Sequence, residues 1–259
     1  MITPEKRWPR RLAQLCTAIR FLTIVPVSWR AADDLHHFNK CLIFFPIVGA
    51  LIGAAGFLGA HLLLLVFPQQ VVAVIALVYL AFISGFLHLD GLSDSADGML
   101  SSRPREDCLR IMKDSRAGAM GVVVVVCVLL AKYSALSAMA PKTLCLAIFF
   151  MPLAGRSAIL LSMARLPYAR AEGGLGNLFY SDRSKTAALS AFLLLAVLLA
   201  ALAPSRLIVT LIAILAMNYF FGRWCKNCLG GATGDTLGAV CELTEAITAV
   251  AFTASFSFL

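Results

Sequence analysis

The chain has 259 residues, of which 60% are hydrophobic and only 14% are charged. A soluble globule would need more polar surface than this, so the composition excludes a soluble domain and favours an integral membrane protein. We assign the net charge of +8 to contacts with anionic lipid headgroups and with a phosphate-rich ligand, and not to nucleic-acid binding.

Several apolar stretches are long enough to cross about 30 Å of hydrocarbon, and no alternating barrel pattern is present. We therefore predict an all-α, polytopic helical bundle that forms a single membrane domain over residues 1–259. A helix at 12–27 precedes the spans and is predicted to lie in the membrane interface. A secretory signal is the competing interpretation, but Arg20 interrupts its apolar part and no small-x-small cleavage site follows. The seven predicted spans are 41–67, 71–89, 119–140, 143–163, 187–203, 207–222 and 236–259.

The distribution of lysine and arginine predicts the orientation of the chain. With the N-terminus in the cytoplasm, 19 of the 22 basic residues lie inside, and three lie outside: Lys132, Lys142 and Arg206. Because positive charge accumulates in cytoplasmic loops, this asymmetry favours a multi-pass protein of the inner membrane with that orientation. The predicted cytoplasmic parts are residues 1–40, 90–118, 164–186 and 223–235.

Eight cysteines are scattered, mostly within or near the spans, which is typical of small apolar residues and not of a disulfide framework. Cys225 and Cys228 form a lone CxxC pair. Without a second pair or nearby histidines, this pair is weak evidence for a metal or redox site, and its role stays open.

The stretch GFLHLDGLSDSADGML (85–100) brings three aspartates to the end of the second predicted span. On a helix, Asp94 lies about 40° and Asp97 about −20° from Asp90, so the carboxylates form one stripe about 10 Å long. Such oxygen ligands suit Mg²⁺ or Mn²⁺, whereas Zn²⁺ would require His or Cys. A solvated helix end is the alternative. At a membrane boundary, three aligned like charges repel without a cation, which favours a metal site.

The motif IMKDSRAGAMG (111–121) adds phosphate-binding side chains immediately before the third span. Guanidinium groups can hold phosphate oxygens in pairs, although positive-inside anchoring alone would also produce a basic loop. Asp114 adds nothing to anchoring, so it is a candidate fourth carboxylate for the metal. The basic residues of this region are Arg103, Arg105, Arg110, Lys113 and Arg116.

The motif GGLGNLF (173–179) lies in a basic loop with Arg170. Its glycines permit backbone amides to approach a ligand closely, but membrane loops are often rich in glycine, so this signal is weak alone.

The motif GGATGDTLGAVCELTEA (230–246) leads into the last span and carries a second acidic set. Asp235 and Glu242 are seven residues apart and share one helix face. Unpaired acids are costly in lipid, so Glu242 and Glu245 are expected to face the bundle interior. Two interpretations of these glutamates are left open: an ion pair with a basic residue such as Arg156, or direct ligation of a metal.

Carboxylates that hold Mg²⁺ beside arginines describe a site for the transfer of a phosphate-linked group. The repeated aspartates resemble those of CDP-alcohol phosphotransferases, although the Ala-Arg that follows their first Asp-Gly pair is absent here. A cation-coupled transporter is a rival from another class, but its acids would lie near the middle of the membrane.

Six motifs, in order along nearly the whole chain, resemble the cobalamin synthase family, the adenosylcobinamide-GDP ribazoletransferases. They are FLTIVPV (21–27), FPIVGALIG (45–53), HLDGLSDSADG (88–98), IMKDSRAGAMG (111–121), GLGNLF (174–179) and GGATGDTLGAVCELTE (230–245). The resemblance implies a Mg²⁺-dependent membrane enzyme that joins adenosylcobinamide-GDP to α-ribazole or its 5′-phosphate, releases GMP and completes cobalamin (vitamin B12). Ile24 departs from the arginine expected there.

The resemblance and the residue chemistry together predict three groups of site residues. His88 is a candidate acid–base residue, with an orienting or packing role as its alternative. Other cobalamin-pathway proteins and oligomerisation are left open as partners. The catalytic candidates are Asp90, Asp94, Asp97 and His88. The Mg²⁺ candidates are Asp90, Asp94, Asp97, Asp114, Asp235 and Glu242. The substrate-binding candidates are Arg103, Arg110, Lys113, Arg116, Arg170, Gly174, Gly176, Asn177 and Gly234.

Overall fold

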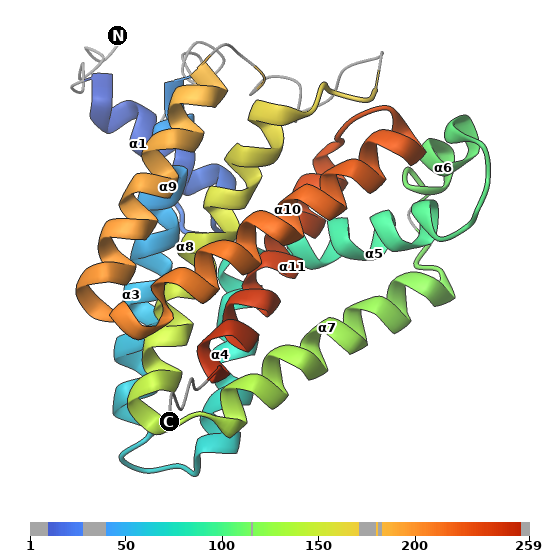
Figure 1. Cartoon of the computed structure of the whole chain (residues 1–259). Coiled ribbons are helices and arrows are strands. Elements are labelled where there is room, and N and C mark those ends of the chain that lie inside the picture. Colours follow the sequence, from blue (N-terminus) through green and yellow to red (C-terminus); the bar gives the residue numbers. More distant parts are fainter. Residues whose placement is uncertain (1–9, 28–39, 115, 171–179, 181–182, 255–259) are drawn as a thin grey trace, which may run out of the picture.

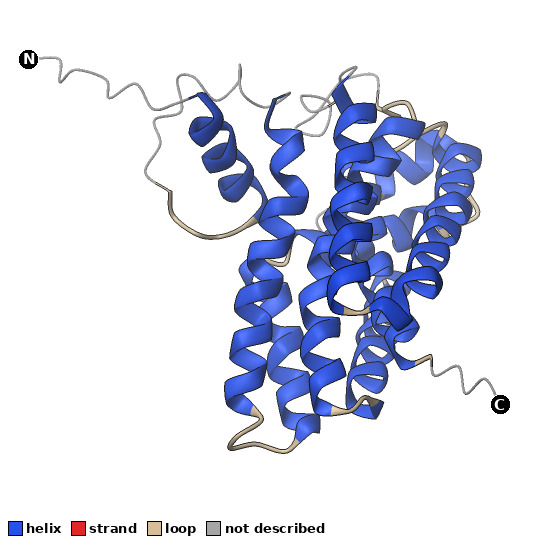
Figure 2. Cartoon of the chain, turned by 60° about the vertical axis from the view of Figure 1, so that its left-hand side comes forward, coloured by secondary structure: helices blue, strands red, loops and turns tan. Residues whose placement is uncertain are grey.

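The computed structural model describes residues 10–27, 40–114, 116–170, 180 and 183–254. Over these residues the chain forms α-helices joined by short turns, with two 3-10 turns, η2 (Leu42–Phe44) and η4 (Pro204–Arg206), and no β-sheet (Figure 2). The α-helices are α1 (Arg10–Leu22), α3 (Phe45–Leu63), α4 (Gln69–Ile83), α5 (Leu87–Met99), α6 (Arg105–Ile111), α7 (Ala119–Ala138), α8 (Pro141–Arg165), α9 (Arg183–Leu202), α10 (Leu207–Leu229) and α11 (Gly234–Thr253).

The all-α membrane bundle is confirmed. Within the described residues, six helices are long and apolar enough to cross a membrane, and a seventh span results if α4 and α5 are one broken span. These helices match the seven predicted stretches, and α10 extends seven residues beyond the predicted end at 222. The prediction works here because a run of about 20 apolar residues leaves the chain no other way to satisfy its backbone in lipid. Helix α1 corresponds to the predicted N-terminal helix.

Two helices, α8 and α11, form the centre of the bundle (Figure 1). In the apolar 18-residue stretches of α8 and α11, 83% and 78% of the residues are buried, whereas the buried share is 28% in those of α7, α9 and α10. α3 and α9 pack on α8, and α5, α7 and α10 pack on α11. The outer helices therefore keep apolar faces that only lipid can cover.

The second predicted span departs from expectation at residues 84–86. Gly85 and Phe86 both have φ 60°, in the left-handed region, and this turn ends α4 and starts α5 at an angle of 87°. A backbone that leaves the right-handed region cannot continue an α-helix, so the apolar run does not stay straight to residue 89.

The break corrects the prediction of a cytoplasmic loop over residues 90–118. Most of this stretch is helical, because residues 90–99 belong to α5 and residues 105–111 form α6. The predicted loop over 223–235 is likewise reduced to a turn at 230–233 between α10 and α11. The aspartates therefore lie on a packed helix that runs across the bundle beside α7 and α11 (Figure 1).

Candidate active site

The three aspartates lie on the less buried side of α5. Asp90 is exposed, whereas Asp94 and Asp97 are half-buried. The opposite side of the helix, which includes His88 and Ser95, is buried against the bundle. The predicted stripe of carboxylates thus forms, but its three members have different surroundings.

Asp97 is held by the start of α7. Its Oδ2 accepts a hydrogen bond of 2.8 Å from the backbone N–H of Gly118, and its Oδ1 accepts one of 2.8 Å from the N–H of Gly121. A carboxylate at a helix N-terminus satisfies N–H groups that have no partner inside the helix. A Cβ at Gly121 would lie 2.5 Å from Asp97 Oδ2, so only glycine permits this approach. Asp97 therefore joins α5 to α7.

Asp94 lies among other carboxylates. It interacts electrostatically with the like charges of Asp90, Asp235 and Asp97, and with the opposite charge of Arg170. The side-chain carboxylates of Asp90 and Asp94 form no hydrogen bond or ion pair with any other described residue. Burial and this repulsion raise the pKa of the Asp94 carboxyl to about 6, and a cation among the carboxylates would offset the repulsion.

Helix α11 brings Asp235 to this group because the two helices cross at glycines. A Cβ on Gly91 of α5 would lie 2.7 Å from the backbone oxygen of Asp235, and one on Gly238 of α11 would lie 3.2 Å from the Cα of His88. Asp235 forms a half-buried ion pair with Arg170, with Oδ2 2.7 Å from Nη2. Gly234 precedes it at the exposed start of α11, where a Cβ would meet nothing within 4 Å.

A basic cavity of about 360 Å³ lies next to this acidic group. Arg105 fixes one wall by donating hydrogen bonds of 2.7 Å to the backbone oxygens of Leu229 and Ala169. Arg170 lines the cavity as well, so the same side chain contacts Asp235 and borders the basic space. The other lining residues are Glu106, Leu109, Arg110 and Lys113.

Tyr168 lies between the two groups. It interacts electrostatically with Arg170, Asp235 and Lys113, and burial raises the pKa of its phenol above the ordinary value. Its backbone pairs with Ala232 in an isolated parallel bridge, which fixes the turn before α11 beside the segment that carries Arg170.

Three predicted site residues, Asp114, Arg116 and Arg110, form ion pairs on the surface. Asp114 accepts two side-chain hydrogen bonds from Arg116, of 3.0 and 2.7 Å, and these bonds lower the pKa of the carboxyl to about 2. Arg110 pairs with Asp107 at 2.7 Å, and both of its groups are exposed. Arg103 is also exposed. The predicted ligands Gly174, Gly176 and Asn177 lie outside the described residues.

A buried network of charges lies deeper in the bundle. Lys132 of α7 donates to Glu242 at 2.6 Å and to Glu245 at 2.8 Å, and Arg156 of α8 pairs with Glu245. The ion pair between Arg156 and Glu245 is confirmed. The structure places Glu242 with Lys132, and not beside the aspartates where the predicted metal site would need it. His88 faces the same network, and its Nε2 has no hydrogen-bond partner within the described chain.

The prediction that Lys132 lies on the outer side of the membrane is wrong. Lys132 is 2% exposed inside the bundle, so it is not one of the outside charges. The sequence carried a signal for this role, because a single lysine in the apolar run that becomes α7 is costly unless an acid pairs with it. Arg105 belongs to the predicted basic region, but the sequence did not predict its hydrogen bonds to the backbone.

Comparison with known proteins agrees with the motifs. A family model described as "Cobalamin-5-phosphate synthase" matches residues 14–253. An adenosylcobinamide-GDP ribazoletransferase of Clostridium acetobutylicum is 36% identical over 239 residues, which cover 90% of this chain and 92% of the relative. Proteins of that name from Alkaliphilus metalliredigens and Citrobacter koseri are each 39% identical, over 88% and 86% of this chain and 89% and 91% of the relatives. No solved structure matches. The chain therefore belongs to the cobalamin-5-phosphate synthase family.

Proposed function

We propose that this transferase moves the adenosylcobinamide phosphate group from adenosylcobinamide-GDP to α-ribazole or its 5′-phosphate, with release of GMP. One observation carries the proposal: Arg170 pairs with Asp235 beside Asp94 and also lines the basic cavity. Carboxylates and phosphate-binding cations are therefore contiguous, as transfer of a phosphate-linked group requires. The names of the relatives supply the substrates.

Mg²⁺ is the cofactor that fits the donor set. No group of three or more His, Cys, Asp or Glu side chains within the described residues has the arrangement of a protein-only metal site. Mg²⁺ is commonly held by one or two carboxylates together with substrate phosphates and water. Asp90 and Asp94 would supply these carboxylates, with Asp235 adjacent. When bound, the ion would neutralise the diphosphate and stabilise the leaving phosphate.

In the proposed reaction, an acceptor hydroxyl attacks the phosphorus that carries the cobinamide. A new P–O bond forms to the acceptor oxygen, the bond to the GMP phosphate breaks, and the hydroxyl proton passes to a carboxylate of the aspartate group. Arg170 and Lys113 would hold the diphosphate, and Asp97 would keep α5 in place against α7. His88 is buried on the side of α5 opposite the aspartates, so we give it an orienting role.

The distribution of lysine and arginine, with Lys132 now placed in the interior, supports an orientation of the chain in the membrane. With Lys132 assigned to the bundle interior, Lys142 and Arg206 are the basic residues left on the predicted outer side. We therefore place the active site and the N-terminus on the cytoplasmic face of the inner membrane.

Product release tests the function directly. Purified protein in nanodiscs, given adenosylcobinamide-GDP, α-ribazole and Mg²⁺, is expected to release GMP, and release should stop when EDTA removes the metal. CMP release from CDP-diacylglycerol would instead identify a phospholipid-type phosphotransferase. Mg²⁺-dependent cation uptake into proteoliposomes, with no nucleotide released, would identify the transporter.

A further inference from the structure

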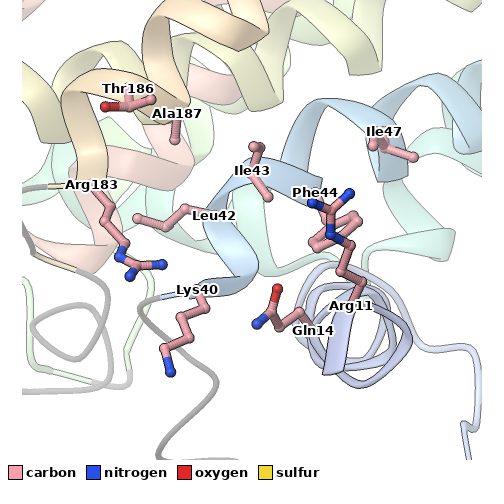
Figure 3. Close-up of a pocket in the computed structure, with 10 residues that line it drawn as sticks. All are labelled: Arg11, Gln14, Lys40, Leu42, Ile43, Phe44, Ile47, Arg183, Thr186 and Ala187. Atoms are coloured by element: carbon pink, nitrogen blue, oxygen red, sulfur yellow. The ribbon is translucent and has the colours of Figure 1, made fainter. Parts of the chain in front are cut away.

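A second cavity, of about 610 Å³, lies at the other side of the molecule between α1, the start of α3 and α9 (Figures 1 and 3). Its basic residues come from three separate segments: Arg11 from α1, Lys40 from the turn before η2, and Arg183 from the first turn of α9. No acidic side chain is among its described lining residues, and none of the three cations forms an ion pair with a described residue.

The opposite wall of this cavity is apolar. Figure 3 shows the polar ends of Arg183, Lys40 and Gln14 on one side and the side chains of Ile43 and Ile47 on the other, with the guanidinium group of Arg11 beside Phe44. Ile43 and Ile47 are 47% and 38% exposed, although they belong to a segment that is long and apolar enough to span the membrane. The wall therefore opens toward hydrocarbon and not toward water.

The cavity lies at the depth of lipid headgroups. The membrane-spanning segments of α3 and α9 begin at Leu42 and Arg183, and alternation of the spans, with α4 and α5 counted as one span, puts both ends on the same membrane face. Lys40 and Arg183 thus sit where the phosphates of that leaflet lie, with the apolar wall directly below them. Basic pockets between membrane helices are suited to anionic headgroups.

We propose that this cavity binds an anionic glycerophospholipid, with its phosphate between Arg11, Lys40 and Arg183 and its upper acyl chains along Ile43 and Ile47. A zwitterionic lipid fits less well, because its headgroup cation would face three like charges with no acid among the described lining residues to offset them. The nucleotide substrate also carries phosphates, but it lacks acyl chains to cover the lipid-facing wall. The transferase centre at α5 and α6 is on the other side of the bundle (Figure 1).

Native mass spectrometry of the purified chain, titrated with phosphatidylglycerol or phosphatidylcholine, tests this site. The wild type should retain one phosphatidylglycerol in preference to phosphatidylcholine. The double variant Arg11→Gln/Arg183→Gln should bind phosphatidylglycerol about 30-fold more weakly, because each basic residue beside an anionic lipid contributes a factor of about five. Binding of phosphatidylcholine should not change.

Two matched variants separate this pocket from general surface charge. Lys185→Gln/Arg223→Gln removes two exposed basic residues that do not line the cavity and should leave phosphatidylglycerol binding unchanged. Ile43→Trp should weaken that binding without changing the charge. Equal loss in the control, or undiminished binding in Arg11→Gln/Arg183→Gln, would overturn the proposal. So would competition by adenosylcobinamide-GDP for the same site, because the cavity would then belong to the substrate.

Discussion

The aspartates of α5 have the same chemistry but different partners, and the partners decide their roles. Both carboxylate oxygens of Asp97 accept hydrogen bonds from backbone N–H groups at the start of α7, whereas Asp90 and Asp94 lie beside other carboxylates. Helical spacing predicted that the three would share a face. It could not predict the contact with Gly118 and Gly121, because that contact joins residues more than 20 positions apart.

We predict that Asp94→Asn lowers the rate of GMP release by about 100- to 1,000-fold, because the neutral amide removes a charge that would hold Mg²⁺ against the diphosphate. The half-buried side chain has no hydrogen bond to lose within the described residues, so the unfolding temperature should stay close to that of the wild type. Asp114→Asn is the matched control in the neighbouring motif. Its exposed carboxylate pairs with Arg116, and its activity should stay within about threefold of the wild type. An equal loss in both variants would place Asp114 in the metal site after all.

The buried lysine leads to a prediction about stability. Lys132→Met leaves Glu242 and Glu245 without their shared partner, and breaking a buried pair on one side costs about 3–5 kcal/mol in the free energy of unfolding. Adding Glu242→Gln removes one uncompensated charge and should recover part of that loss. Denaturant unfolding in micelles measures both variants. A Lys132→Met protein as stable as the wild type would show that the network contributes nothing to the fold.

At the scale of helices, the spans were predictable because length and hydropathy alone define them. The turn at Gly85 and Phe86 was not, because the apolar pattern continues through it and no proline marks a break. A left-handed residue such as Phe86 is fixed by packing around it and leaves no signal in composition. For the same reason, the sequence predicted that the aspartates share a helix face but not that their helix turns away from α4 by 87°.

The crossing of α5 and α11 positions the acidic group, and Gly91 sets its distance. In Gly91→Ala the new Cβ would meet the backbone of Asp235, so the helices must move apart. We predict at least a tenfold loss of GMP release and a higher Mg²⁺ concentration for half-maximal activity, read from a metal titration.

Gly59→Ala is the control for this prediction, because a Cβ there meets nothing within 4 Å. An alanine at this position should leave both quantities unchanged. If Gly91→Ala behaves in the same way, then the close crossing does not set the geometry of the site.

At the scale of the whole molecule, the charge pattern predicts which face lies inside, and the structure changes only the place of Lys132. We predict that, in a chain whose native cysteines are replaced, Arg223→Cys reacts with an impermeant maleimide only in inverted vesicles. Lys142→Cys should react only in right-side-out vesicles. Both side chains are exposed in the structure. The reverse pattern would put the active site outside the cytoplasm.

The site as a whole was only partly predictable. Motifs and charge placed the aspartates, Arg170 and Asp235 together, and the structure brings these groups to one place. The sequence could not separate the proposed ligands from structural partners, because Glu242 and Asp114 satisfy the same helical and loop patterns as Asp90 and Asp94. Basic residues far away in the sequence, such as Lys132, determine which acidic side chains form ion pairs and which do not.

The most direct test is a structure with adenosylcobinamide-GDP and Mg²⁺ bound and the acceptor omitted. We predict a cation held by Asp90 and Asp94 that also contacts the diphosphate, with Arg170 and Lys113 on the remaining phosphate oxygens. A diphosphate held by lysine and arginine alone, with both aspartates turned away from it, would contradict the proposed mechanism.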